Sequence, residues 1–266
     1  MIRREKEMDA VLNSEKNRGL RSFHVEADGI TVYRYGMTDS TNLRAKAVAT
    51  PDFSGNALFI AEGQSAGRGR LGRSFYSPAA TGLYFSCLFS TTAPLYEFLA
   101  LMPAVSVACA RAIEEYCGKR VGIKWVNDLY FEEKKVCGIL VESVNATCAK
   151  DCNKLVVGVG INLNTEDFPP ELAGIAGSLG ACPDGEKMAL AVHREVQRYV
   201  ARPSDRSFME EYAARSVVVG KSVKLLRGEE VFCGTVSGFD DDGGIVLVEK
   251  GERRVFHGGE ITLRLQ

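Results

Sequence analysis

The chain has 266 residues, of which 45% are hydrophobic and 25% charged, a balance typical of a globular protein. Its apolar content excludes disorder along the whole chain, and its formal net charge of -1 argues against a protein that lives on nucleic acid. The length predicts one main domain with a small second one. No run is apolar for long enough to span a bilayer, and no signal-peptide core follows the N-terminus, so we expect no membrane association.

The eight cysteines show no spacing typical of a metal site. Cys87 and Cys137 lie within apolar runs, where a free thiol acts as a small hydrophobic side chain. Cys148 and Cys152 are four residues apart, but neither a histidine nor a second cysteine pair accompanies them, so zinc is not expected. Reduced thiols predict a cytoplasmic protein.

The first part of the chain reads as a leader followed by an α+β domain. Residues 1–22 are rich in Arg, Lys and Glu and predict a loosely ordered leader. Apolar runs predict strands at residues 30–36, 57–62, 82–90, 122–126, 129–131, 136–144 and 154–164. Helical spacing predicts a helix from Asp39 or Ser40 to about Ala49, and further helices at residues 94–117, 186–201 and 205–215. Several strand runs are apolar on both faces, so helices should cover one side of the sheet.

The pattern changes after residue 217. Five short apolar runs separated by Gly and Asp turns predict a small β-barrel over residues 218–266. The α+β domain therefore occupies residues 23–217, and a small all-β domain follows it.

The segment with the clearest chemical signal is residues 67–73, GRGRLGR, where glycines alternate with arginines between two predicted strands. Glycines let backbone N–H groups approach a ligand, and arginine grips phosphate or carboxylate with two hydrogen bonds. The segment lacks the Lys-Ser/Thr ending and the following helix of a P-loop. A flexible basic surface loop remains the alternative interpretation.

Four other segments combine polar side chains with glycines or strand breaks. KWVNDLY (124–130) places an amide and a carboxylate at a strand break, although Asn and Asp are also ordinary turn residues. KKVCGILVE (134–142) has Gly138 inside a strand, which often marks the close approach of a ligand, although a charged hairpin turn leading into a core strand is the alternative. DSTN (39–42) offers helix N-terminal N–H groups with hydroxyls and an amide, or a plain helix cap. GVGINL (158–163) is a strand with two glycines and an asparagine, typical of a pocket wall or a bulge.

Taken together and in this order, the segments closely resemble the biotin protein ligase family. The matching text is DSTN, AEGQSAGRGRLGR, KWVNDLY, KKVCGILVE and GVGINLN, with HGGEITLR near the C-terminus, and the resemblance covers about residues 30–265. The family has Pro where this chain has Val126 and often Trp where it has Phe75, which bears on the shape of the pocket. The resemblance implies a mixed sheet covered by helices, like that of class II synthetases, and a C-terminal barrel of the Src-homology-3 type.

The resemblance also implies a two-step ligation. Biotin and ATP form biotinyl-adenylate and pyrophosphate, and a lysine of a biotin carboxyl-carrier domain of a biotin-dependent carboxylase then attacks the adenylate. Biotin-binding roles fall on Ser40, Thr41, Asn42, Gln64, Arg68, Gly69, Arg70, Lys135 and Gly138. Roles on the ATP and Mg²⁺ side fall on Arg70, Arg73, Lys124, Asn127, Asp128 and Asn162, without assigned metal ligands. Catalytic roles fall on Lys135, Arg70 and Arg68, and residues 67–73 are expected to close over the site.

Three alternatives remain at the level of sequence. A lipoate ligase would share the adenylation step, but GRGRLGR followed by KWVNDLY is not expected of one. A biotin-sensing repressor would need a DNA-binding domain, and only about 30 residues precede the first expected strand, too few for a winged helix, so we expect no DNA partner. A non-catalytic binding module would not need Lys135 together with the full arginine segment. The chain is expected to act as a monomer or a homodimer.

Overall fold

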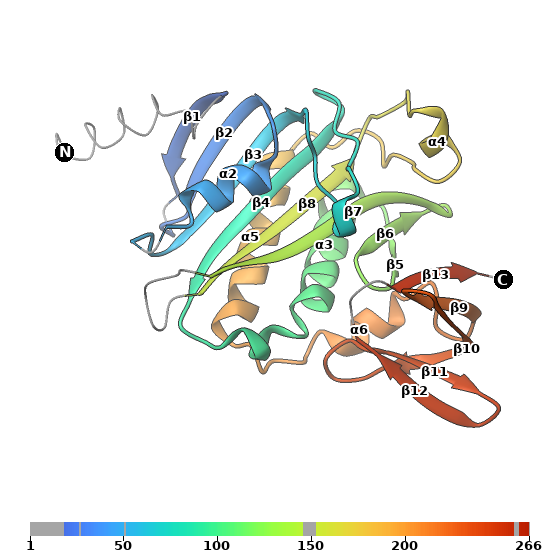
Figure 1. Cartoon of the computed structure of the whole chain (residues 1–266). Helices are drawn as coiled ribbons and strands as arrows, with labels where there is room; N and C mark the ends of the chain where they lie inside the picture. The colour runs from blue at the N-terminus through green and yellow to red at the C-terminus, as the bar shows by residue number, and fades with distance from the viewer. Residues whose placement is uncertain (1–18, 27, 51, 146–152, 258–260, 266) are drawn as a thin grey trace.

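A large mixed sheet and a smaller antiparallel sheet make up the computed structural model of the chain (Figure 1). The structure describes residues 19–26, 28–50, 52–145, 153–257 and 261–265. The large sheet has eight strands in the order β1-β2-β3-β4-β8-β7-β6-β5. These strands are β1 (Leu20–Val25), β2 (Thr31–Thr38), β3 (Asn56–Gln64), β4 (Gly82–Thr91), β5 (Gly122–Lys124), β6 (Asp128–Phe131), β7 (Lys134–Asn145) and β8 (Asn153–Asn162).

One strand pair makes the large sheet mixed. Strands β2 and β3 run parallel, with Thr31 opposite Ala57, and the other neighbouring pairs are antiparallel. The parallel pair requires a crossover, and α2 (Thr41–Val48) supplies it. This crossover places the start of α2 at one end of the sheet, close to the end of β3.

Helices lie on both faces of the large sheet, and successive residues of a strand point to opposite faces. Cys87 and Phe89 of β4 belong to the main core, which they share with α3 (Leu101–Cys117) and α5 (Gly185–Ala201). Leu88 between them points the other way and packs in a second core with Ala45 of α2. Figure 1 shows α2 in front of the sheet and the two long helices behind it. The expectation that helices cover one side therefore holds for α3 and α5, whereas α2 covers part of the opposite face.

The remaining elements include two short helical segments, residues 70–72 and 170–173, and one strand that were not predicted from the sequence. The 3-10 helices η2 (Arg70–Gly72) and η3 (Leu95–Phe98), and the helices α4 (Pro170–Ala173) and α6 (Met209–Ala214), complete the main domain. Strand β1 lies antiparallel to β2 and includes Leu20, which we expected in a loose leader. The rest of that expected leader, residues 1–18, lies outside the described residues, as does most of the segment containing Cys148 and Cys152. None of the helices in the described part of the chain is both long and apolar enough to cross a membrane.

The C-terminal part forms a five-stranded antiparallel sheet in the order β12-β11-β10-β9-β13. Its strands are β9 (Ser222–Arg227), β10 (Glu230–Phe239), β11 (Ile245–Glu249), β12 (Glu252–Phe256) and β13 (Ile261–Leu265). The five predicted strands are confirmed. The sheet is joined to the main domain by a buried contact in which Trp125 Nε1 donates to the carbonyl oxygen of Gly243 at 2.8 Å.

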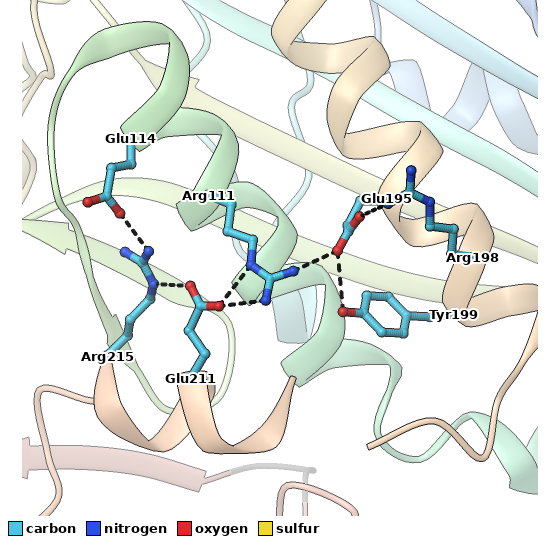
Figure 2. Close-up of polar contacts among 7 residues, drawn as sticks. All are labelled: Arg111, Glu114, Glu195, Arg198, Tyr199, Glu211 and Arg215. Carbon is cyan, nitrogen blue, oxygen red and sulfur yellow. Dashed lines mark hydrogen bonds and ion pairs between the residues drawn. The ribbon is translucent and has the colours of Figure 1, made fainter. Parts of the chain in front are cut away.

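A network of charged side chains connects α3, α5 and α6 (Figure 2). Arg111 of α3 pairs with Glu195 of α5 at 2.8 Å and with Glu211 of α6 at 2.6 Å. Arg215, just after α6, pairs with Glu211 at 2.7 Å and with Glu114 of α3 at 2.6 Å. The Arg215 side chain is only 8% exposed, so its contacts are shielded from solvent better than those of an ordinary surface pair.

Replacing Arg215 with methionine should lower the free energy of unfolding by about 1–3 kcal/mol, because two carboxylates lose charged hydrogen bonds in a partly buried setting. Arg198 is the matched control, since its side chain is 77% exposed and pairs with Glu195 at 2.9 Å. Arg198→Met should change stability by less than about 0.5 kcal/mol. Urea denaturation measures both variants, and equal losses would contradict the importance of burial for this network.

Candidate active site

The N-terminus of α2 forms one end of the candidate site. Ser40, Thr41 and Asn42 are all buried there. Ser40 occupies the N-cap position without a side-chain cap bond, and its own N–H donates to the Asp39 carboxylate at 2.6 Å. The Thr41 N–H donates to Gln64 Oε1 at 2.9 Å, so the end of β3 satisfies a free N–H group of the helix. The side chains that line the cavity at this end are therefore uncharged and rich in hydrogen-bonding groups.

Residues 67–73 form a loop that folds back on itself across the site, and we call it the lid loop. Arg68 and Ser74 form an isolated antiparallel bridge, and the Gly69 N–H donates to the Arg73 carbonyl at 2.7 Å. Leu71 between them has a φ of 60°. The loop thus has a folded backbone conformation.

Arg70 connects the lid loop to the KWVNDLY segment. Its Nη1 donates to Asn127 Oδ1 at 3.2 Å, and Asn127 Nδ2 in turn donates to the carbonyl oxygen of Ile139 at 3.0 Å. Burial lowers the pKa of Arg70, and the charge of Asp128 opposes this effect. A guanidinium keeps its proton at any physiological pH, so Arg70 places a fixed positive charge over the site.

Lys135 stands opposite a carboxylate at the centre of the site. Its Nζ lies 2.7 Å from Asp128 Oδ1. The side chain is presented by the two-residue turn Glu132-Glu133 between β6 and β7, in which both residues have positive φ, as a tight hairpin turn requires. The Lys135 backbone is also held from the other side, because its N–H donates to Ile175 O and its carbonyl accepts from Gly177 N, both at 2.9 Å.

These segments enclose a cavity of about 200 Å³. Its floor includes Gly138 and Gly160 on neighbouring strands, and the ring of Phe75 lies on them. A Cβ at Gly160 would stand only 2.4 Å from this ring, so glycine is needed for the ring to lie there. The lining residues are Ser40, Thr41, Asn42, Gln64, Arg68, Gly69, Arg70, Leu71, Arg73, Ser74, Phe75, Lys124, Trp125, Asn127, Asp128, Lys135, Gly138, Ile139, Leu140, Gly158, Val159 and Gly160.

All but one of the site residues predicted from the sequence line this cavity, although several have contacts that the sequence did not suggest. Asn162 is the exception: it does not line the cavity, and its Nδ2 donates to Gly177 O at 3.1 Å. The nucleotide role predicted for Asn162 therefore has no support in this geometry, because the side chain is directed at the segment that holds Lys135. Lys124 lines the cavity while its Nζ lies 3.3 Å from the Tyr130 hydroxyl.

Three residues that complete the site were not predicted from the sequence. Glu142 and Ser86 hold the Asn42 amide from behind the cavity, and Trp125 links its wall to the C-terminal sheet. A polar side chain inside an otherwise apolar strand run, as in LYFSCLF and VCGILVE, was the available signal for the first two. Among the described residues, no group of three or more His, Cys, Asp or Glu side chains is arranged to hold a metal ion.

Comparison with known proteins gives a consistent result. Residues 36–162 match the biotin/lipoate A/B protein ligase family, and residues 218–264 match the biotin protein ligase C-terminal domain. The chain is 30% identical to the biotin–[acetyl-CoA-carboxylase] ligase of Paracoccus denitrificans, over 84% of this chain and 97% of that one. It is 29% identical to the bifunctional ligase/repressor BirA of Escherichia coli, over 90% of this chain and 76% of BirA.

Solved structures are similar over the same extent. The biotin protein ligase of Aquifex aeolicus in complex with biotin and ATP is 31% identical, with a TM-score of 0.74. The match covers 88% of this chain and 99% of that one, so it includes both the large sheet and the C-terminal sheet.

Proposed function

The chain belongs to the biotin protein ligase family, and from this membership we propose how its own residues perform the reaction of such a ligase. It is an ATP-dependent ligase that activates biotin and transfers it to a lysine of a carboxylase carrier domain. A biotin carboxylate oxygen attacks the α-phosphorus of ATP, and the bond to pyrophosphate breaks. The lysine nitrogen then attacks the biotinyl carbonyl, the C–O bond to AMP breaks, and the amine loses a proton.

The observation that carries this proposal is the polarity of the cavity. Its uncharged end holds hydroxyl and amide groups of Ser40, Thr41 and Gln64. Its other end holds the cations Arg70 and Lys135. A ligand with an uncharged ureido ring at one end and a carboxylate at the other is complementary to this distribution.

We assign the uncharged end to the biotin head group. Ser40, Thr41 and Gln64 offer donors and acceptors to a ureido ring, and Phe75 on Gly138 supplies an apolar wall. Arg68 and Gly69 of the lid loop cover the bound biotin. Asn42 contributes by shape, because its amide already bonds to Glu142 and Ser86.

The charged end receives the biotin carboxylate and the phosphates of ATP. Negative charge grows on the α-phosphate and on pyrophosphate as the reaction proceeds, and fixed cations stabilise it without having to reorganise. Lys135 and Arg70 are positioned to provide these charges, and Arg73 and Lys124 also line the cavity. Closure of the lid loop also shields the adenylate, a mixed anhydride, from water.

We propose that Mg²⁺ accompanies ATP and that Asp128, with Asn127 beside it, supplies the protein's ligands. Mg²⁺ in such sites is held by one or two carboxylates together with substrate phosphates. Asp128 is the only carboxylate among the described residues that line the cavity, which fits this pattern. When bound, the metal neutralises phosphate charge during displacement.

We further propose that the C-terminal sheet curls into a small barrel of the Src-homology-3 type. The register of β10 against β11 shifts between Val236 and Gly238, and such a bulge bends a strand. For partners, we propose the carrier domain and no DNA, with the enzyme acting as a monomer or a homodimer.

Biotin-dependent exchange of labelled pyrophosphate into ATP tests the first half-reaction directly. Transfer of biotin to a purified carrier domain tests the second. Lipoate serves as the competing substrate in both assays. Exchange that depends on lipoate and not on biotin, or no exchange with either, would contradict the proposed function.

The lid loop should resist proteolysis once ligand is bound. Arg68, Arg70 and Arg73 carry like charges that repel one another until an anion binds between them. Trypsin should cleave at these arginines rapidly in the free enzyme and slowly with biotin and ATP present. Lys250, exposed in the turn between β11 and β12, is the internal control, and its cleavage should not respond to ligand. Equal cleavage of the lid loop in both states would reject its role as a lid.

A further inference from the structure

Glu142 lies behind the candidate site, on β7, and the reaction as described so far does not use it. Its side chain is 20% exposed and is absent from the cavity lining. Three donors surround its carboxylate. Asn42 Nδ2 donates to Oε2 at 2.9 Å, Lys46 Nζ lies 2.6 Å from Oε1, and Arg68 Nη2 lies 4.0 Å from the same oxygen.

The charge of Glu142 is maintained by these partners. Burial alone would raise the pKa of its carboxyl group, but hydrogen bonds from Lys46 and Asn42 and the charges of Lys46 and Arg68 hold the pKa below its usual value. The group is therefore an anion at neutral pH. A half-buried anion attracts whatever cation can reach it, and Arg68 belongs to the lid loop.

The Asn42 amide is held in a single orientation. An ionised carboxylate can only accept, and Nδ2 is the only donor of the Asn42 side chain, so Nδ2 faces β7 and Oδ1 faces β4. There the hydroxyl of Ser86, which is fully buried, donates to Oδ1 at 2.5 Å. A Cβ at Gly158 would stand 2.1 Å from Oδ1, so the strand beneath must be free of a side chain. The amide of Asn42 is thus fixed from three sides.

The same hydrogen-bond network continues to Ser77, which lies beyond the lid loop in sequence. Ser86 Oγ lies 2.7 Å from Thr41 Oγ1, and the Thr41 N–H donates to Gln64 Oε1 at 2.9 Å. Gln64 Nε2 then donates to Ser77 Oγ at 2.9 Å. Ser77 follows the lid loop in sequence, whereas Arg68 is near its beginning. A hydrogen-bond network therefore runs beneath this end of the cavity, from Glu142, which forms an ion pair with Arg68 of the lid loop at 4.0 Å, to Ser77, four residues beyond the loop.

We propose that Glu142 is a positioning residue for biotin binding, which fixes the Asn42 amide at the uncharged end of the cavity and holds Arg68 of the lid loop above it. Through these two contacts the carboxylate makes closure of the lid loop depend on an ordered biotin site. This inference rests on the proposed assignment of the uncharged end to biotin. It concerns the biotin end, because the described contacts of Glu142 and Asn42 do not include Asn127 or Asp128, and the lid loop reaches Asn127 through Arg70 instead.

Two substitutions separate the functions of the carboxylate. Glu142→Ala removes both contacts, and Glu142→Gln keeps an amide oxygen that can accept from Asn42 while losing the attraction for Arg68. Loss of a charged hydrogen bond corresponds to a change of about tenfold to a hundredfold in a binding constant. Glu142→Ala should therefore raise KM for biotin by that factor, with KM for ATP changed less than about twofold.

Glu142→Gln should raise KM for biotin less than Glu142→Ala does. It should, however, make tryptic cleavage at Arg68 faster and less sensitive to biotin, because the charge that holds the lid loop is gone. The split between the two KM values does not depend on the fraction of folded enzyme, so a destabilised Glu142→Ala preparation still reports on binding. If Glu142→Ala yields no folded protein, Glu142→Gln alone tests the lid loop.

Lys46→Met is the matched control, since Lys46 binds the same carboxylate oxygen but lies on α2 outside the cavity. It should raise KM for biotin less than Glu142→Ala does, because Asn42 and Arg68 keep their contacts with the carboxylate, and it should leave KM for ATP unchanged. An equal rise in KM for biotin in Lys46→Met would show that the ion pair to α2, and not the contact with Asn42 and Arg68, is responsible, and would overturn the inference. Normal kinetics and normal lid cleavage in both Glu142 variants would overturn it as well. Absence of biotin-dependent exchange in the parent enzyme would instead refute the proposed function.

Discussion

Lys135→Ala should slow biotinyl-adenylate formation by about 10²–10³, the effect of removing one preorganised group that stabilises charge in a transition state. Lys135 Nζ lies 2.7 Å from Asp128 in the cavity. The other lysine of β7, Lys134, does not line the cavity. The incoming phosphate carries more charge than Asp128 does, so the ammonium group is positioned to change partners during catalysis. The measurement is biotin-dependent pyrophosphate exchange under saturating substrates.

Lys134→Ala is the matched control for this substitution. Lys134 is the neighbouring residue on the same strand, is exposed, and does not line the cavity. It should retain parent activity. Lys135→Arg keeps the positive charge but not its compact shape, and should recover part of the lost rate.

Supplying purified biotinyl-adenylate to Lys135→Ala separates the two half-reactions. The adenylate bypasses the step in which charge develops on pyrophosphate. Transfer to the carrier domain should therefore be slowed much less than adenylate formation. Equal losses in both steps would indicate that Lys135 positions the carrier lysine or the fold instead of the phosphate, and parent-like exchange would show that it has no catalytic role.

The elements of the fold could be predicted from the sequence because each depends on local patterns. Apolar runs such as GLYFSCLFS place β4 correctly, and the same holds for the five C-terminal strands. The order of strands could not be predicted in this way. The parallel pairing of β2 with β3 depends on contacts between residues distant in sequence, such as Tyr33 stacked on Phe59 with ring centroids 4.8 Å apart. Strand β1 was not predicted because residues 20–25, LRSFHV, show no regular alternation of apolar and polar side chains. Its place in the sheet is set by pairing with β2.

The candidate site shows the same division. Its motifs were recognisable because each is a short run of polar residues and glycines. The partners behind them were not, because Glu142 and Asn42 are 100 residues apart in sequence, and only the fold brings them within hydrogen-bond distance. Asn162 lies in a motif but bonds to Gly177, which no local pattern indicates. Motifs therefore identify the residues that line the cavity more readily than those that hold these residues in place.

Arg70→Gly should allow the enzyme to release biotinyl-adenylate before transfer. Arg70 Nη1 donates to Asn127 at 3.2 Å, so the guanidinium connects the lid loop to the opposite wall of the cavity. Losing a charged hydrogen bond costs about 1.5–3 kcal/mol, which corresponds to escape about ten- to a hundredfold faster. Adenylate formation should suffer less, because Lys135 still balances the charge of the α-phosphate.

Free biotinyl-adenylate acylates any exposed lysine, so the expected result is biotin on bystander proteins. Albumin added at equal enzyme concentration should become labelled with Arg70→Gly and remain unlabelled with the parent enzyme, as detected on a blot for biotin. Leu71→Gly is the control for loop flexibility, because it also introduces a glycine into the lid loop but removes no charge, and Leu71 is 53% exposed. It should label only the carrier. Labelling of albumin by both variants would attribute retention to loop stiffness, and carrier-only labelling by an active Arg70→Gly enzyme would show that Arg70 does not retain the intermediate.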